Sequence, residues 1–219
     1  MNDDFSKLKE MKYSGRGITI GMTLEENPFI GYTLTGRSPS SQARKLVYDK
    51  LLSKIRTDVT DPEQLKKGNP ALLIYPAIVS ISDMKIVASN GVQTKLLTNS
   101  ARYSLLFLGG EDYFYPVDVL VNAMSKPVNE NGIYITTYEP DAPNFTPRIS
   151  GCLDEKFGGF HIVRKITNRS PDVNVFSFNL ESGIARLITT YLGGNENPLL
   201  PFRGDPLEAK VQSVNASQI

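Results

Sequence analysis

The chain has 219 residues, of which 40% are hydrophobic and 21% charged, so its composition is that of a globular protein and excludes a disordered or fibrous one. Lys and Arg number 24 against 23 Asp and Glu, and a net charge of +1 gives no overall field that would attract nucleic acid or an anionic membrane. A single cysteine excludes an intramolecular disulfide, and a single histidine leaves too few His and Cys ligands for the usual zinc sites. We therefore expect a cytoplasmic protein with no cofactor, with a carboxylate-bound magnesium ion still open.

The first 35 residues predict a helix and a hairpin. Apolar residues at positions 5, 8 and 11 recur at helical spacing, which indicates a short helical extension over 1–12 rather than a signal peptide. Two β-rich segments, 17–21 and 29–35, flank the turn-forming residues 25–28. This pattern is typical of a β-hairpin early in a sheet.

Further strands are predicted near the middle of the chain. The longest apolar run, 71–81, is too short to cross a bilayer and contains Pro76, so we interpret it as buried strands. Another strand is expected over 85–89, after a turn at Ser82 and Asp83. Asn90 with Gly91 predicts a second turn that uses positive φ.

The second half is also rich in strands. One helix is expected over 117–124, with Pro116 at its N-terminal position. Residues 184–192 fit a strand or a helix, and their threonines and tyrosine favour a strand. Clear strand patterns occupy 148–153, 159–166 and 173–178. Strands outnumber helices, which predicts one α+β domain over 13–206, with a surface tail or short closing helix over 207–219.

Two short loops concentrate groups that bind anions. Arg16 lies between two glycines at the start of a strand, and Gly36 to Arg44 contributes Arg37, Ser38 and Arg44. Arginine forks pair with phosphate oxygens and hydroxyls fill the remaining acceptors, so these loops predict a phosphate site. Solvated polar turns with no ligand remain the alternative.

A third cluster carries candidates for proton transfer. The segment 138–149 holds three prolines together with Glu139, Asp141 and Arg148. A stiff loop that carries charges favours a functional role, with a structural Glu139–Arg148 ion pair as the alternative. Tyr75 closes an apolar run and is either a catalytic phenol or a core residue with its hydroxyl at the surface. His161 and Cys152 are expected to be a satisfied sheet residue and a small core residue.

Taken in order, several motifs resemble the IMP cyclohydrolase family of the archaeal type and its bacterial relatives. They are YSGRG (13–17), GRS (36–38) with Arg44, NP (69–70) with Tyr75, SNG (89–91), YEPDAPNFTPRI (138–149), TTY (189–191) and PFRGDP (201–206). The similarity extends from Tyr13 to about Pro206. It implies a four-layer αββα sandwich of the Ntn-hydrolase type without an autoprocessed nucleophile.

The implied reaction is closure of 5-formamidoimidazole-4-carboxamide ribonucleotide to inosine monophosphate with loss of water, the last step of purine synthesis. Tyr75 and Glu139 resemble the family's active-site tyrosine and glutamate and would transfer protons. Arg44 resembles a substrate-binding arginine, and the resemblance extends substrate contacts to a further set: Arg16, Arg37, Ser38, Asn90, Gly91 and Arg148. Arg148 would orient Glu139.

Two alternatives to this reaction remain. One is a cyclase or amidohydrolase that acts on another purine-like nucleotide, and the other is a non-catalytic protein that binds purine nucleotides. All three functions have a nucleotide as partner, and none calls for nucleic acid, a membrane or a metal. A homo-oligomer is compatible with each of them.

Overall fold

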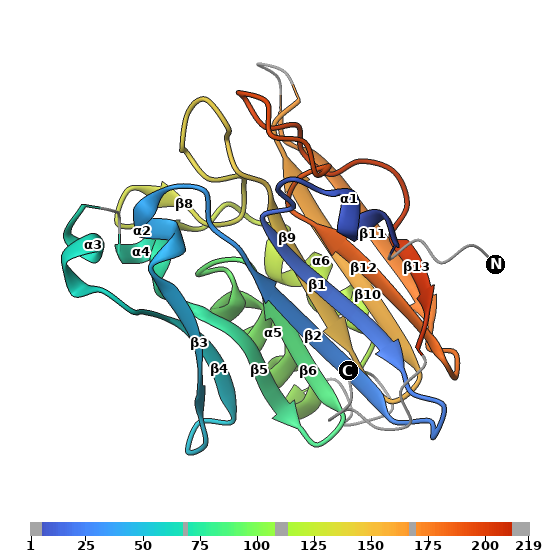
Figure 1. The fold of residues 1–219 in the computed structure, drawn as a ribbon. Coiled ribbons are helices and arrows are strands. Elements are labelled where there is room, and N and C mark those ends of the chain that lie inside the picture. Colours follow the sequence, from blue (N-terminus) through green and yellow to red (C-terminus); the bar gives the residue numbers. More distant parts are fainter. Residues whose placement is uncertain (1–5, 68–69, 108–113, 167–169, 212–219) are drawn as a thin grey trace.

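The computed structural model describes residues 6–67, 70–107, 114–166 and 170–211, and two antiparallel β-sheets dominate it (Figure 1). The smaller sheet has four strands in the order β13 (Leu207–Lys210), β12 (Ile184–Thr189), β1 (Arg16–Met22) and β2 (Pro28–Leu34). The larger sheet has seven, in the order β11 (Asp172–Asn179), β10 (Phe157–Arg164), β9 (Arg148–Leu153), β6 (Lys85–Ser89), β5 (Pro76–Ser82), β4 (Lys54–Val59) and β3 (Arg44–Asp49). A short ribbon pairs β7 (Asn129–Glu130) with β8 (Ile133–Tyr134).

The described helices differ greatly in length. The two that cover a sheet are α5 (Thr94–Phe107) and α6 (Pro116–Met124). The others are single short turns: α1 (Ser6–Glu10), α2 (Pro39–Gln42), α3 (Pro62–Lys66) and α4 (Pro70–Leu73). None of the helices in the described part of the chain is long and apolar enough to cross a membrane.

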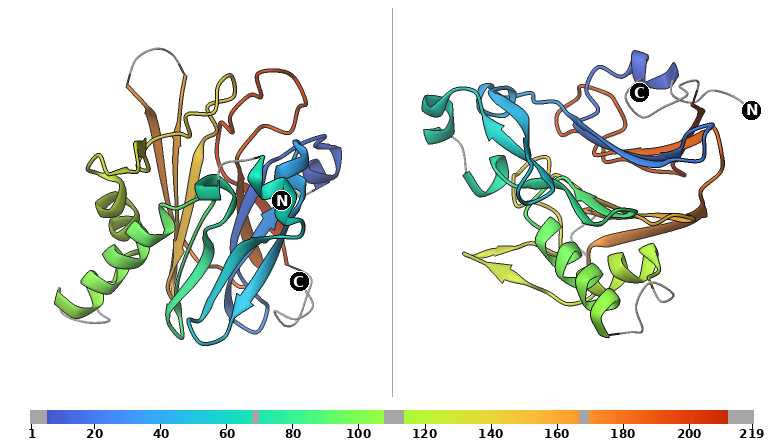
Figure 2. Two further views of the ribbon diagram at one scale, coloured as in Figure 1. Left: turned by 90° about the vertical axis from the view of Figure 1, so that its left-hand side faces the viewer. Right: turned by 90° about the horizontal axis from the view of Figure 1, so that it is seen from below.

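The sheets pack face to face because each has one apolar face. Ile18 and Ile20 of β1 are fully buried against Ile149 of β9 and Phe160 of β10. Gly151 allows the sheets to approach closely, since a Cβ there would lie 2.9 Å from Cγ2 of Ile18. The opposite face of the larger sheet is covered by α5 and α6, as the right-hand view of Figure 2 shows.

These elements give three stacked layers, two sheets and one pair of helices. On the outer side of the four-stranded sheet, the described residues supply only α1, and none of the residues of that helix is buried (Figure 2). The predicted α+β class and the predominance of strands are confirmed. The described ranges contain one helical layer where the expected αββα sandwich has two.

Most predicted elements are confirmed, and four segments differ. The run 71–81 is not all strand, since α4 occupies Pro70–Leu73 and the strand begins only at Pro76. Residues 207–210 form β13 and pair with β12, so this part of the expected tail belongs to the sheet. Asn90 and Gly91 do not adopt positive φ and instead lead into α5, a helix that the sequence analysis missed. The β3–β4 hairpin was missed as well.

Candidate functional site

The centre of the candidate site is an ion pair between segments far apart in the sequence. Nη2 of Arg16, at the start of β1, donates to Oε1 of Glu139 at 3.0 Å. Both residues are almost fully buried, with 7% and 4% of their surfaces exposed. The backbone of Arg16 is fixed by Thr190, whose Oγ1 accepts from the Arg16 N–H at 3.1 Å. The arginine therefore reaches Glu139 from a rigid position in the sheet.

Glu139 belongs to a loop that is held closed by its own side chains. Its N–H donates to the carbonyl of Thr146 at 2.8 Å. The carboxylate of Asp141 accepts from the backbone N–H of Thr146 at 2.6 Å and from its hydroxyl at 2.5 Å. The hydroxyls of Thr146 and Tyr191 lie 2.6 Å apart, which ties this loop to the end of β12. Neither Thr146 nor Tyr191 was assigned a role from the sequence, although Tyr191 belongs to the TTY motif.

Burial and charge act against each other at this pair. Burial raises the pKa of Glu139, and the charges of Arg16 and Arg148 reduce that rise without cancelling it. Burial lowers the pKa of Arg148, a shift that the charge of Glu139 opposes. For Arg16, burial is the largest single effect and works against the charged form, but the attraction of Glu139 together with that of Tyr75, Tyr32 and Tyr191 outweighs it and the pKa is raised. The result is a carboxyl group that holds its proton more firmly than usual between two cations, as a proton-transfer group requires.

The predicted anion-binding residues line one pocket with Glu139. Its volume is about 260 Å³, and Arg16, Arg37 and Arg44 face two carboxylates, Glu139 and Asp141. Its other lining residues are Tyr13, Ser38, Ser40, Ser41, Leu72, Leu73, Asn144, Thr146, Tyr191 and Leu199. The structure thus brings together five of the nine residues expected to form the site.

The loop before β3 is closed by hydrogen bonds between two of its serines. Ser38 caps α2, and its Oγ accepts from the N–H of Ser41 while Ser41 Oγ accepts from the N–H of Ser38. Arg44 braces the same loop by donating from Nε to the carbonyl of Ser41 at 2.9 Å. Arg37 donates to the carbonyl of Glu196 at 3.2 Å and is exposed. Each arginine keeps further N–H donors for a ligand.

Tyr75 lies outside the lining of this pocket but within the electrostatic reach of Arg16. It is 2% exposed, and its N–H donates to Oγ1 of the fully buried Thr57 at 2.9 Å. Its hydroxyl is 3.0 Å from that of Tyr32 on β2, a partner the sequence did not indicate. The two phenols form a hydrogen-bonded pair in which one hydroxyl donates to the other, and that leaves one O–H free to donate elsewhere.

Asn90, Gly91 and Arg148 do not belong to the lining of the 260 Å³ pocket. Asn90 donates to the carbonyl of Pro147 at 2.8 Å and accepts from the N–H of Ile149 at 3.0 Å. Arg148 is fully buried and donates from Nη1 to Oε1 of Gln93 at 2.9 Å, while the same Nη1 lies 3.8 Å from Glu139. Asn90 therefore holds backbone in place, and Gln93 is a partner of Arg148 that the sequence analysis missed.

Arg148 also forms part of a second cavity. This cavity has a volume of about 310 Å³, and Leu72 lines both it and the first pocket. Nε and Nη2 of Arg148 are buried and have no hydrogen-bond partner among the residues that the structure describes. These two nitrogens share one edge of the guanidinium, the edge that pairs with two acceptor atoms at once.

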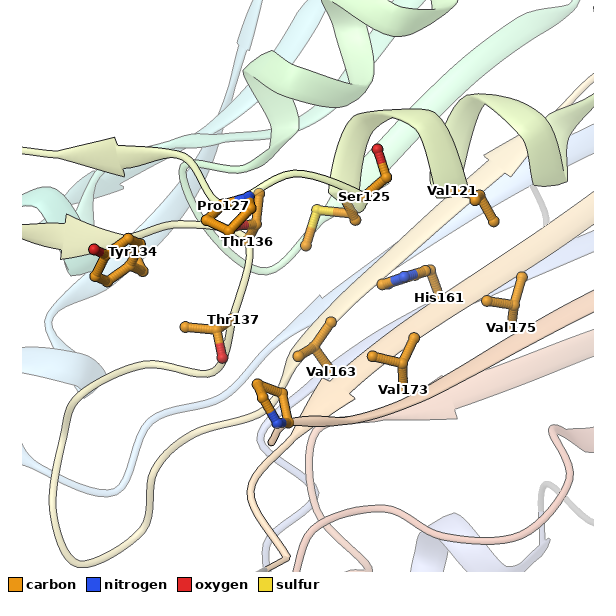
Figure 3. A pocket seen from close by; sticks show the side chains of 12 residues that line it. Val121, Ser125, Pro127, Tyr134, Thr136, Thr137, His161, Val163, Val173 and Val175 are labelled. Atoms are coloured by element: carbon orange, nitrogen blue, oxygen red, sulfur yellow. The ribbon is translucent and has the colours of Figure 1, made fainter. Parts of the chain in front are cut away.

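Another cavity, of about 590 Å³, lies elsewhere, between α6, the segment 125–137 and strands β10 and β11 (Figure 3). Among the described residues, no charged side chain lines it. His161 is part of its wall, and burial lowers the pKa of this imidazole to about 4. His161 is a buried strand residue as expected, but it is not satisfied, because no group in the described part of the chain forms a hydrogen bond with Nδ1. Cys152 is a buried core residue as predicted, and burial raises the pKa of its thiol.

No group of three or more His, Cys, Asp or Glu side chains suited to a metal ion occurs within residues 6–67, 70–107, 114–166 and 170–211. The polar side chains of the candidate site are instead arginines, hydroxyls and carboxylates. This donor set suits an anionic organic substrate.

Comparison with known proteins finds a family model and two relatives that match this chain. Residues 13–105 match the sequence model of a family described as IMP cyclohydrolase-like proteins. The IMP cyclohydrolase of Methanococcus maripaludis strain S2 is 26% identical over 181 residues, which is 82% of this chain and 74% of the relative. The enzyme of strain C7 is 26% identical over 179 residues, with the same shares covered. The predicted resemblance to the IMP cyclohydrolase family is confirmed.

The family match covers the first half of the site. Arg16, Arg37, Ser38, Arg44 and Tyr75 all lie within residues 13–105. Glu139 and Arg148 lie beyond it, within the longer stretch needed for an alignment that spans 82% of the chain. The similarity to IMP cyclohydrolases agrees with the expectation of an enzyme.

Proposed function

We propose that this protein is an IMP cyclohydrolase that closes 5-formamidoimidazole-4-carboxamide ribonucleotide to inosine monophosphate with release of water. The observation that carries the proposal is the buried Arg16–Glu139 pair, 3.0 Å apart, on the wall of a pocket that also contains Arg37 and Arg44. A proton-transfer group and an anion-binding loop thus share one cavity.

The substrate phosphate binds to the loop before β3. Arg37 and Arg44 supply guanidinium donors and Ser38 a hydroxyl, all from the lining of the same pocket. This arrangement suits the three terminal oxygens of a phosphate monoester. Phosphate binding then fixes the heterocycle relative to Glu139 and holds the two reacting groups in one plane.

Ring closure requires two proton movements. The carboxamide nitrogen attacks the formyl carbon and forms a C–N bond, while the formyl oxygen becomes a hydroxyl. Loss of one hydrogen from the carboxamide nitrogen and one from the formamido nitrogen, together with that oxygen, yields the ring and one water molecule. Glu139 takes the first proton and returns one to the leaving hydroxyl.

The oxygen that gains negative charge during attack needs hydrogen-bond donors. Tyr75 is proposed to donate its O–H there, because Tyr32 holds the phenol at 3.0 Å and can donate to it in turn. The unpartnered Nε and Nη2 edge of Arg148 offers two further donors for carbonyl oxygens of the substrate. Asn90 and Gly91 act indirectly in this proposal, through Arg148.

The fold relationship is part of the same proposal. Two sheets stacked face to face, with helices on the outer face of one, support an Ntn-hydrolase-like sandwich over 13–206 with the extension 1–12. A soluble nucleotide as substrate supports a cytoplasmic location and needs neither nucleic acid nor a membrane. A homo-oligomer remains compatible with this account.

An absorbance assay of inosine monophosphate formation tests the function. Wild-type protein is expected to turn over the formamido ribonucleotide, and Glu139→Gln to reduce kcat by at least about a hundredfold. Nucleotide binding, measured by calorimetry with inosine monophosphate, should survive in Glu139→Gln. Glu155→Gln, which removes an exposed carboxylate far from the pocket, is the matched control.

The outcomes separate the alternatives. A wild-type protein that binds inosine monophosphate but never forms it would be a nucleotide-binding protein or an enzyme for another purine-like nucleotide. Equal rates in wild type and Glu139→Gln would remove Glu139 from the mechanism.

A further inference from the structure

Gln93 is a buried polar side chain to which neither the motifs nor the comparisons assign a role. It lies just before α5 and is 0% exposed. Its Oε1 accepts from Nη1 of Arg148 at 2.9 Å, and its Nε2 donates to Oδ1 of Asn90 at 3.0 Å. Both ends of its amide are therefore occupied, and its orientation is fixed.

Asn90 anchors this contact to the backbone of the sheet. Its Oδ1 also accepts from the N–H of Ile149 at 3.0 Å, and its Nδ2 donates to the carbonyl of Pro147 at 2.8 Å. These two residues flank Arg148 in the sequence. Asn90 thus ties the turn that carries Gln93 to the backbone on both sides of Arg148.

Gly91 leaves the space in which this contact forms. A Cβ at position 91 would lie 2.5 Å from Nη1 of Arg148 and 2.6 Å from Oε1 of Gln93. Because Gly91 does not have positive φ, the need for glycine is one of space and not of backbone conformation. The segment 89–93 therefore leaves room at Gly91 for the guanidinium end of Arg148 and contacts it through Gln93.

The contact determines how far Arg148 is from Glu139. The same Nη1 that donates to Gln93 lies 3.8 Å from Oε1 of Glu139, too far for a hydrogen bond but close enough for a strong charge interaction. Without the Gln93 acceptor, a buried guanidinium would move toward the carboxylate or rotate away from it.

We propose that Gln93 is a positioning residue for the reaction: it fixes Arg148 at a set distance from Glu139 and thereby sets the charge environment in which Glu139 transfers protons. The inference rests on the proposed function, because it assigns Glu139 the proton-transfer role. It adds a residue that does not touch the 260 Å³ pocket.

Several charged groups act on Glu139 and bear on the test. Arg16 on β1, Arg148 on β9 and Arg44 on β3 lower its pKa, and Asp141 of the same loop raises it. Arg148 in turn responds to Glu139, Arg16, Asp141 and Tyr75, and Glu130 lines the cavity beside it. Among these groups, Arg148 is the one that Gln93 contacts, so an uncharged substitution at Gln93 acts on Glu139 through Arg148.

The experiment measures kcat/KM from pH 5 to pH 9 in three variants of the full chain. Gln93→Glu keeps the acceptor and adds a negative charge that neutralises Arg148. Gln93→Met keeps the volume and removes the acceptor. Gly91→Ala keeps both side chains but forces them apart, and because both contacted atoms are the ends of long side chains the fold should survive.

Gln93→Glu is expected to move the limb of the profile that reports Glu139 to higher pH by on the order of one unit, since it adds a negative charge near the carboxyl and weakens the effect of a cation. Gln93→Met and Gly91→Ala should lower kcat more than they change KM. Gln64→Glu, which adds the same charge on α3, should leave the profile unchanged.

A second readout makes the test independent of turnover. The Glu139 carboxyl is titrated by ¹³C NMR, with Glu139→Gln used to assign its signal. A higher midpoint in Gln93→Glu than in wild type supports the inference even if the substrate differs from the one proposed. Folded variants with wild-type midpoints and profiles would overturn it, whereas a wild type inactive on the formamido ribonucleotide would overturn only the proposed function.

Discussion

Arg16 and Glu139 are 123 positions apart in the sequence, yet their side chains meet at 3.0 Å in a nearly solvent-free environment. Arg16 belongs to the four-stranded sheet, and Glu139 lies in the loop that leads into the seven-stranded sheet. The pair therefore links the two sheets at one edge and forms part of the pocket wall.

Replacing Arg16 by methionine should destabilise the protein in a pH-dependent way. The variant leaves Glu139 buried without its hydrogen-bonded cation, and we expect the free energy of unfolding near pH 8 to fall by about 3 kcal/mol. The loss should shrink toward pH 5. The pKa of Glu139, already raised by burial, rises further without the cation, so the folded variant keeps its carboxyl proton to higher pH than the unfolded chain does.

Urea denaturation of the Arg16→Met variant at several pH values checks this, with Arg203→Met as a control that removes an exposed arginine. A loss that is the same at pH 5 and pH 8 would contradict the proposed electrostatic origin.

The phenol pair predicts unequal effects of two similar substitutions. Tyr75→Phe should lower kcat by about tenfold to a hundredfold, because it removes the donor to the substrate oxygen. Tyr32→Phe should lower kcat by a smaller factor. Burial is the main cause, and the neighbouring Tyr75 the second, that raises the pKa of Tyr32 well above its ordinary value. The Tyr32 hydroxyl should therefore stay protonated throughout an assay at pH 6–9. Tyr48→Phe on β3, where the side chain is exposed, should have no effect. Equal losses in the first two variants would indicate that the pair acts as one unit.

Arg37 and Arg44 should be required for binding the substrate phosphate and should contribute little to the chemical step. Arg37→Met and Arg44→Met should each raise KM by about tenfold or more with smaller changes in kcat. The effect of Arg44 should be larger because it also holds the carbonyl of Ser41 at 2.9 Å. With the matching riboside, which lacks the phosphate, wild type and variants should react alike. A difference that persists with the riboside would place the phosphate elsewhere.

His161 should destabilise the fold in mild acid. Burial lowers the pKa of this imidazole from 6.5 to about 4. Between these two pH values the unfolded chain binds a proton at His161 and the native protein does not. Stability is therefore lost as the pH falls from about 6.5 to 4, by at most about 3 kcal/mol. Because the sequence has one histidine, a single imidazole signal in the NMR spectrum reports the titration directly.

His161→Gln should have a flatter stability curve than wild type in the same pH interval. A midpoint near 6.5 for the imidazole would show that solvent reaches the ring freely.

The sequence was most informative where one side of a strand is apolar. The β1–β2 hairpin and strands β9 to β12 alternate or run apolar between clear turns, and all were predicted. The β3–β4 hairpin was missed because both of its short strands carry several charged residues and only Thr57 among their residues is buried. The apolar run 71–81 was divided wrongly, since a short apolar segment has no period that separates one helical turn from a strand.

The sequence predicted which loops form the candidate site, but it did not predict which side chains contact one another there. Arginine and serine in Gly36–Arg44 and Glu139 in a proline-stiffened loop were recognisable from residue type alone. Tyr32, Gln93 and Tyr191 were not, because each acquires its partner through sheet pairing or sheet stacking. Asn90 was expected to touch the substrate, but its amide bonds to the backbone on both sides of Arg148 and to Gln93.

The position of Glu139 between arginines of two different sheets has a consequence for mutations far from the pocket. Arg16 moves with one sheet and Arg148 with the other, so the spacing between the sheets sets the balance of charge at a single carboxyl. A substitution that thickens or thins the layer formed by Ile18, Ile149 and Phe160 would then alter the pH at which the reaction runs. Substitutions in this apolar layer would therefore shift the pKa of Glu139 without changing any group that touches the substrate.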